Sequence, residues 1–293
     1  MPSPELEAMV QSLLDAPIVG APSLEEERAG FEEMLCAFPL PENASVTAHP
    51  LGEIEADWVS VPEADSSRAI LYLHGGGYVI GSHKAYREFA ARLASACKAR
   101  VLVLNYRLAP EHPFPAAVDD AVLAYRDIRE QSDIKHVAIA GDSAGGGLTV
   151  ATMLALKNQG LPQPDCAICL SPWTDLTISG ASAEPGAVSD PMVSLDRLKG
   201  MASQYAEGEQ SNPLASPLFG DLAGLPPLYI AVGTRELLLD DTRRFVERAR
   251  AAGVSLETEV EDGLIHIWPV FPTLPEAAPT LANIGRFTDA NFG

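Results

Sequence analysis

The sequence predicts an α/β fold in which a mostly parallel sheet is covered by helices on both faces. Five short apolar runs, rich in β-branched residues, predict buried strands: RAILYLH, RVLVLNY, HVAIAG, CAICLSP and PLYIAVG. Segments that predict helices lie between most of these runs, at 84–97, 116–130, 144–158 and 241–252. Buried strands that alternate with helices are typical of parallel sheets with both faces covered. Functional groups in such sheets collect at the carboxyl ends of the strands.

The first part of the chain predicts two helices ahead of this alternation. Five apolar residues recur there at helical spacing: Leu6, Met9, Val10, Leu13 and Leu14. They predict an amphipathic helix at 4–16 that Pro17 ends. Ser23 and Glu26 form a capping box, which predicts a second helix at 24–37.

Two further strands and one long insertion complete the expected organisation. The strands are expected at 45–50 and 55–61, where the pattern alternates with polar residues. The longest interruption of the strand and helix alternation lies at 174–226, with a helical stretch at 194–206. Such an insertion would lie over the strand ends like a lid, where loops commonly carry function.

Composition excludes several classes of partner. The 293 residues are 47% hydrophobic, which is enough for a large core. The formal net charge of −20 argues against binding to nucleic acid or to anionic membranes, because Lys and Arg are not in excess. Neither a signal peptide nor a membrane-spanning run is evident, so the expected location is the cytoplasm.

Cys166 and Cys169 form a C-x-x-C pair, which could indicate redox or metal chemistry. They lie inside the predicted buried strand CAICLSP, and no second Cys/His pair completes a zinc site. We therefore expect structural cysteines rather than metal ligands.

The stretch HVAIAGDSAGGG places Ser143 in a G-x-S-x-G motif, directly after a predicted strand and directly before a predicted helix. This context is typical of a nucleophile elbow, where glycines permit a tight turn that exposes the serine hydroxyl. A glycine-rich turn with an incidental serine is the alternative. The strand and the helix favour a nucleophile, and the start of the helix offers N–H groups to an anion.

A second glycine-rich motif, LYLHGGGYVIG, follows another predicted strand. Its backbone N–H groups can approach a ligand closely, which suits an oxyanion that develops during acyl transfer. A phosphate loop is disfavoured because neither G-K-[ST] nor G-x-G-x-x-G is present. His74 is a possible base, but we expect it to hold this loop by hydrogen bonds.

His266 lies in EDGLIHIWPVF, after the strand-like SLETEVE. A pKa near neutrality suits a general base that then acts as a general acid. A buried core histidine is the alternative, but serine, acid and histidine in this chain order are typical of a hydrolase triad. The other histidines lack such a setting: His49, His83, His112 and His136.

Together these motifs resemble the bacterial hormone-sensitive-lipase-like esterases, also called family IV, in their GDSAG subgroup. The matching segments are HGGG at 74–77, YRLAPEHPFPAA at 106–117, GDSAGG at 141–146, SPWTDLT at 171–177 and GLIHIWP at 263–269. The resemblance implies an α/β-hydrolase fold, in which 1–44 form a helical cap region and 45–293 the catalytic domain. Within that domain 174–226 would contribute a cap or lid insertion.

The resemblance also implies an activity and its residues. It implies hydrolysis of carboxylic esters with short to medium acyl chains, without a metal or cofactor, and a possible homodimer. Ser143 would be the nucleophile and His266 the base. The backbone N–H groups of Gly76, Gly77 and Ala144 would bind the oxyanion.

The acid of the triad departs from the family pattern, which usually has an aspartate just past the strand that PLYIAVG represents. The segment TRELLLDD offers Glu236, Asp240 and Asp241. Glu236 follows the strand immediately, so its side chain should project into the site. Asp240 and Asp241 come a turn later, where they are expected to cap the next helix. Glu236 is therefore favoured, then Asp240, and Asp241 last.

Other functions stay open at this point. A related acyl hydrolase, such as an amidase, formamidase or deacetylase, would use the same triad and oxyanion hole. A small-molecule receptor on the same fold, as in the plant gibberellin receptors, is disfavoured because those receptors lack the catalytic histidine. A lipase is disfavoured because no strongly apolar exposed helix is evident. Tyr78, Tyr205 and Trp268 are expected either near the pocket or in the core.

Overall fold

The structure is a computed structural model that describes residues 2–15 and 22–292. Its centre is an eight-stranded sheet with the strand order β1-β2-β4-β3-β5-β6-β7-β8. The strands are β1 (Ser45–Ala48), β2 (Ala56–Ser60), β3 (Asp65–Leu73), β4 (Ala99–Leu104), β5 (His136–Asp142), β6 (Cys166–Leu170), β7 (Leu228–Gly233) and β8 (Leu256–Glu261). The pairs β1–β2 and β2–β4 are antiparallel and all other neighbours are parallel. The predicted mostly parallel sheet is confirmed.

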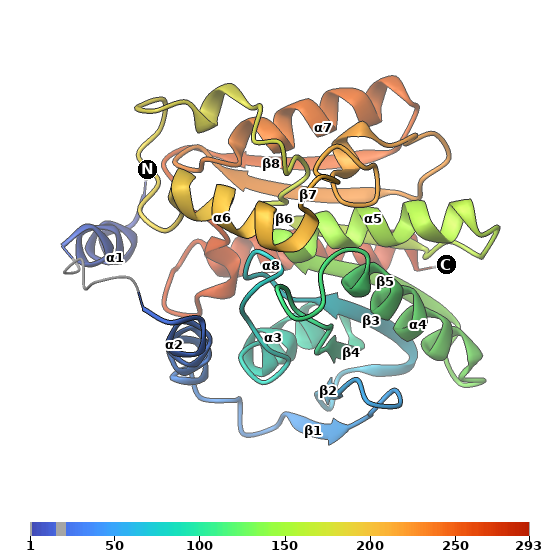
Figure 1. Cartoon of the computed structure of the whole chain (residues 1–293). Coiled ribbons are helices and arrows are strands. Elements are labelled where there is room, and N and C mark those ends of the chain that lie inside the picture. The colour runs from blue at the N-terminus through green and yellow to red at the C-terminus, as the bar shows by residue number, and fades with distance from the viewer. Residues whose placement is uncertain (1, 16–21, 293) are drawn as a thin grey trace.

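Helices cover both faces of this sheet (Figure 1). They are α1 (Pro4–Leu14), α2 (Leu24–Cys36), α3 (Arg87–Cys97), α4 (Ala116–Glu130), α5 (Ala144–Asn158), α6 (Leu195–Ala206), α7 (Leu239–Ala251) and α8 (Ala277–Asn291). Short 3₁₀ turns lie at η1 (Ala181–Ala183), η2 (Pro217–Phe219) and η3 (Trp268–Val270). One core joins the sheet to α4, α5, α6 and α7, and a second core joins it to α1, α2, α3 and α8.

Alternate residues of a strand face opposite cores, as the pleat of a strand requires. In β3, Leu71 and Leu73 belong to the core of α4, α5 and α7, whereas Ile70 and Tyr72 belong to that of α3 and α8. Both sets are buried, which is why the strand appears in the sequence as a continuous apolar run.

The N-terminal helices differ little from their prediction. Ser23 and Glu26 form the expected capping box at the start of α2. The first helix ends at Leu14, and Pro17, its predicted end, lies outside the described residues. Ion pairs and hydrogen bonds fix both helices to the remainder of the chain. Glu7 of α1 pairs with Arg235 at 2.6 Å, and Arg28 of α2 donates to two loop carbonyl groups at 2.9 Å.

The helix α8 was not predicted from the sequence. Its apolar residues Leu281, Ile284 and Phe287 are buried and have helical spacing, but Pro279 interrupts the sequence near its start. Proline is tolerated in the first turn of a helix, where its missing N–H has no partner within the helix. The predicted helix at 241–252 also begins earlier than expected, at Leu239.

The close packing of α8 on α3 gives a test of the fold. A Cβ at Gly285 would collide with the carbonyl oxygen of Ala96, so we expect Gly285→Ala to lower the free energy of unfolding by about 1–3 kcal/mol. Gly200 of α6 is a matched control, because it is exposed and, apart from its chain neighbours and its own helix backbone, no described atom lies within 4 Å of its Cβ position. Gly200→Ala should raise the free energy of unfolding by about 0.5–1 kcal/mol, because alanine favours a helix more than glycine does. Urea denaturation measures both, and an unchanged Gly285→Ala would contradict the close approach.

Candidate active site

Ser143 lies at the turn between β5 and α5, with φ 53° and ψ −120°. This backbone conformation is strained for a residue with a side chain and is typical of a nucleophile elbow. The flanking glycines permit it: a Cβ at Gly145 would collide with the carbonyl oxygen of Leu73, and a Cβ at Gly141 with that of Gly145. The turn therefore places Ser143 at the carboxyl end of the sheet, where it lines a cavity.

The glycine loop after β3 lines the same cavity. Gly76 and Gly77 have φ values of 112° and 62°, which favour glycine. A Cβ at Gly77 would also collide with the Sδ of Met201. Among the described residues, neither amide N–H has a hydrogen-bond acceptor in the protein, so both can serve a ligand. Ala144, the third expected donor, is the first residue of α5.

A buried carboxylate joins this loop to the turn. Asp142 accepts hydrogen bonds from the Gly75 N–H at 2.9 Å and from the hydroxyls of Tyr72 at 2.6 Å and Tyr86 at 2.8 Å. Burial raises the pKa of Asp142 to about 6, and the two tyrosines limit the rise. The role of Asp142 was not evident from the sequence, although its place next to Ser143 was an available signal.

His74 has the loop-holding role that the sequence analysis expected. Its side chain is fully buried and stacks on the Tyr106 ring, with 4.3 Å between centroids. Its Nδ1 lies 2.8 Å from the carbonyl oxygen of Gly75. Burial lowers the pKa of His74 to about 4, so the imidazole is neutral near pH 7 and holds the loop without a buried charge.

His266 and Glu236 meet at the carboxyl ends of β7 and β8. The Nδ1 of His266 lies 2.8 Å from the Oε2 of Glu236, and both side chains are buried. Burial alone would lower the pKa of His266, but the hydrogen bond and charge of Glu236 raise it above its usual value. The second oxygen of Glu236, Oε1, accepts from the N–H of Gly233 at 2.5 Å and from the hydroxyl of Ser171 at 2.8 Å.

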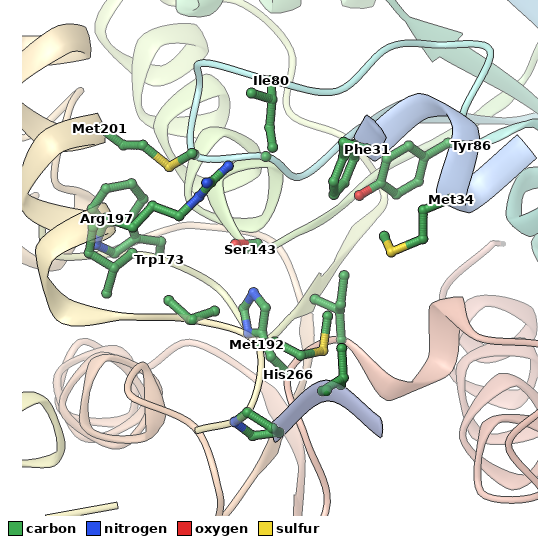
Figure 2. A pocket seen from close by; sticks show the side chains of 17 residues that line it. Phe31, Met34, Ile80, Tyr86, Ser143, Trp173, Met192, Arg197, Met201 and His266 are labelled. Carbon is green, nitrogen blue, oxygen red and sulfur yellow. The ribbon is translucent and has the colours of Figure 1, made fainter. Parts of the chain in front are cut away.

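A cavity of about 270 Å³ lies beside His266. Figure 2 shows the side chains that line it. Ser143 and His266 both line it, together with Gly76 and Gly77. Most of the remaining lining is apolar. It comes from α2, from the segment between β3 and α3, from the loop after β6, and from α6 with the loop before it: Phe31, Met34, Ile80, Tyr86, Trp173, Met192 and Met201. Arg197 supplies a cationic group there, and it pairs with Glu27 at 2.8 Å.

The aromatic residues expected near the pocket do not line it. The Tyr78 and Tyr205 rings stack on each other with centroids 3.8 Å apart, and Trp268 donates to Thr280 of α8. All three are buried in the core, the alternative that the sequence left open. The aromatic side chains that do line the cavity are Phe31, Tyr86 and Trp173, the last in the motif SPWTDLT.

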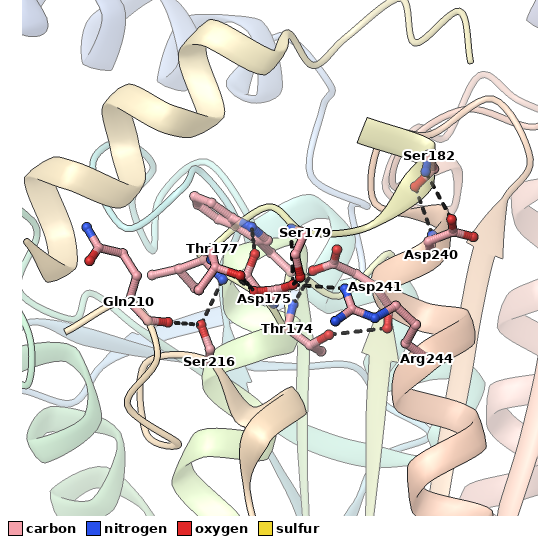
Figure 3. A network of polar contacts seen from close by, with 12 residues as sticks. Thr174, Asp175, Thr177, Ser179, Ser182, Gln210, Ser216, Asp240, Asp241 and Arg244 are labelled. Atoms are coloured by element: carbon pink, nitrogen blue, oxygen red, sulfur yellow. Dashed lines mark hydrogen bonds and ion pairs between the residues drawn. The ribbon is translucent and has the colours of Figure 1, made fainter. Parts of the chain in front are cut away.

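The prediction that Asp240 and Asp241 cap α7 is wrong. The helix begins at Leu239 and no side chain caps it. Asp240 instead accepts from the Ser182 N–H at 2.9 Å, and Asp241 accepts from the N–H groups of Thr174 and Asp175 at 2.9 and 2.8 Å (Figure 3). Both carboxylates hold the insertion against α7, and His266 bonds to neither.

A second buried carboxylate lies beside Asp241. Asp175 accepts from Thr177, Ser179 and Arg244 (Figure 3). Burial alone would raise the pKa of Asp175, but these hydrogen bonds lower it. Burial and the charge of Asp175 raise the pKa of Asp241 to about 8.

Cys166 and Cys169 are buried thiols of β6. Burial raises the pKa of Cys169 to about 12, which leaves its thiol protonated and unreactive. Within residues 2–15 and 22–292, no group of three or more His, Cys, Asp or Glu side chains could hold a metal ion. No helix in the same residues is long and apolar enough to cross a membrane.

A family model described as the alpha/beta hydrolase fold matches residues 70–270. The chain belongs to the α/β-hydrolase fold family. Its match to an acetyl-hydrolase of Streptomyces hygroscopicus is 40% identical over 98% of this chain and 97% of the relative. An esterase of Acinetobacter venetianus is 34% identical over 87% of this chain and 86% of the relative.

Solved structures place this α/β-hydrolase in a narrower branch. A crystal structure of an esterase from the bacterial hormone-sensitive lipase family has a TM-score of 0.95 and 42% identity, and covers 100% of both chains. A hormone-sensitive lipase from a metagenome library has a TM-score of 0.92 and 37% identity over the same coverage. The predicted relation to the bacterial hormone-sensitive-lipase-like family is confirmed.

The contact of Glu236 with His266 allows an experiment to distinguish the two favoured candidate acids, Glu236 and Asp240. We expect Glu236→Gln to lower kcat for an ester by about 10²–10⁴-fold, because an amide cannot stabilise the imidazolium as a carboxylate does. Asp240→Asn should keep kcat within about two-fold of the original, since its amide oxygen can still accept from Ser182. Steady-state kinetics with p-nitrophenyl butyrate measure both. The reverse order of the two variants would refute the assignment.

The raised pKa of Asp241 predicts a pH-dependent stability. The folded protein keeps this proton up to about pH 8, whereas the unfolded chain loses it near the ordinary value of 3.8. Protonated Asp241 therefore contributes its full stabilisation of the fold below pH 3.8, and this contribution is lost as pH rises through about 8. Asp241→Asn stays neutral, so its stability relative to the original protein should increase from pH 5 to pH 8. Urea denaturation across that range measures the difference, which would be constant if Asp241 did not titrate there.

Proposed function

We propose that this protein hydrolyses carboxylic esters through an acyl-enzyme formed on Ser143. Esterase and acetyl-hydrolase relatives that match nearly the whole chain support carboxylic ester hydrolysis. The observation that carries the mechanism is one cavity lined by Ser143, the oxyanion glycines and His266, with His266 bonded to a buried carboxylate.

The first half of the proposed reaction forms the acyl-enzyme. The Oγ of Ser143 attacks the ester carbonyl while the Nε2 of His266 takes its proton. Glu236 accepts from Nδ1–H and stabilises the imidazolium without taking the proton itself. The N–H groups of Gly76, Gly77 and Ala144 donate to the oxyanion of the tetrahedral intermediate. His266 then protonates the departing alcohol.

The second half releases the acid and restores the serine. Water loses a proton to His266 and attacks the acyl carbonyl, and the same N–H groups stabilise the second oxyanion. Collapse of this intermediate expels the Ser143 oxygen, which recovers its proton from His266. The cycle needs no metal or cofactor.

The small volume of the cavity supports substrates with short to medium acyl chains. Its volume of about 270 Å³ lies just below the range for small-molecule sites, roughly 300–1,000 Å³. The relative from Streptomyces hygroscopicus is named an acetyl-hydrolase, which favours the short end. An amidase or deacetylase would use the same groups and is the second candidate.

The cavity wall also supports a proposal about the cap. Residues 1–44 and the insertion at 174–226 act as the cap over the catalytic domain at 45–293, because α1, α2 and α6 all contribute side chains to the cavity wall. The homodimer and the cytoplasmic location also stay predictions from the sequence.

A panel of p-nitrophenyl acetate, butyrate, octanoate and palmitate, with an amide analogue of the butyrate, tests this function. We expect the highest kcat/KM on acetate or butyrate, and little turnover of palmitate or the amide. Ser143→Ala should lose all measurable turnover, since the nucleophile is removed. Highest activity on palmitate would refute the size limit, and faster turnover of the amide would favour the second candidate.

A further inference from the structure

Ser171 follows the last residue of β6 and is fully buried. Its φ is 46°, in the left-handed region that favours glycine. A glycine would adopt this backbone with less strain, so the presence of a side chain here points to a use for the hydroxyl. The cavity lining does not include Ser171, which places it behind the reacting groups.

The Ser171 hydroxyl connects two loops that end on different strands. It donates to the Oε1 of Glu236 at 2.8 Å, in the loop after β7. It accepts from the N–H of Ile267 at 3.0 Å, in the loop after β8. One hydroxyl therefore contacts both the carboxylate and the residue that follows His266.

The backbone at Ile267 also depends on this contact. Ile267 has φ 50° and ψ 32°, which is an outlier for a β-branched residue. Such strain persists only where the surroundings over-determine the conformation. The Ser171 hydroxyl is the acceptor for this N–H, so it helps to hold the adjacent His266 in place.

The Ser171 hydroxyl also restrains the long side chain of Glu236. A glutamate has one more rotatable bond than an aspartate, so its carboxylate needs more restraint to keep one orientation. The N–H of Gly233 and the hydroxyl of Ser171 both hold Oε1, which leaves Oε2 directed at the Nδ1 of His266. Without the hydroxyl, Gly233 would be the single donor to Oε1 among the described residues.

We propose that Ser171 is a positioning residue for ester hydrolysis: its hydroxyl fixes the Glu236 carboxylate and the His266 loop relative to each other. The inference rests on the proposed function. Ser171 acts through two other residues, so removal of its hydroxyl should lower kcat without changing how the ester binds.

Two variants separate the hydroxyl from the backbone. Ser171→Ala removes the hydroxyl and keeps the strain, whereas Ser171→Gly removes the hydroxyl and relieves the strain. We expect both to lower kcat for p-nitrophenyl butyrate by about 10–100-fold, as small misplacements of catalytic groups do. KM should stay within about two-fold of the original. Thermal melting checks folding. Ser171→Gly should melt within about 5 °C of the original protein, because relief of the backbone strain stabilises the fold while loss of the hydroxyl's hydrogen bonds destabilises it.

Ser216→Ala is the matched control. Ser216 is also fully buried, and its hydroxyl likewise donates once, to Gln210, and accepts once, from Leu176. It contacts neither Glu236 nor His266 and should keep kcat within about two-fold. A Ser171→Gly variant with the kcat of the original protein would overturn the proposal.

A double-variant cycle tests whether Ser171 acts through Glu236. In the Glu236→Gln background, Ser171→Gly should cost less than about three-fold further in kcat, because coupled residues are not additive. A full 10-fold or greater further loss there would overturn the coupling. Turnover that survives in Ser143→Ala would instead refute the proposed function, and with it this inference. Loss in Ser143→Ala together with normal Ser171 variants would refute the inference alone.

Discussion

The tight turn at Ser143 is the constraint to which the remainder of the site is fitted. Its backbone lies in a conformation that costs of the order of 1–3 kcal/mol for a residue with a side chain. The helix α5 that follows is buried along nearly its whole length between the sheet and its neighbours, and this packing offsets the strain. The glycines around the turn allow α5 to approach the end of β3 so closely that a methyl group at Gly145 would not fit.

The buried carboxylate of Asp142 extends this constraint to the glycine loop after β3. It lies one residue before Ser143 and bonds to the N–H of Gly75 and to two tyrosine hydroxyls. A buried carboxylate without such donors would be costly, so the fold keeps the loop and the turn together. The expected oxyanion donors and the serine are thereby held as one unit, before any substrate binds.

The side chains of Glu236 and His266 reach this unit from the β6–β8 side of the sheet. Glu236 and His266 follow β7 and β8, and Ser171 follows β6. The strands are parallel, so their carboxyl ends meet at one edge, and residues far apart in the chain become neighbours. The hydroxyl of Ser171 completes the contacts of Glu236, so that both of its carboxylate oxygens have hydrogen-bond partners.

The sequence by itself determined the parallel sheet, the elbow at Ser143, the glycine loop and the preference for Glu236, because each depends on local spacing that a reader can count. It did not reveal Asp142, Ser171 or the real partners of Asp240 and Asp241. Local helix-start patterns favoured capping for those two aspartates, whereas their carboxylates bind a segment about 60 residues earlier in the chain. Only the tertiary structure decides such contacts, since hydrogen bonds between distant loops depend on which strand ends are neighbours and leave no periodic trace in the chain.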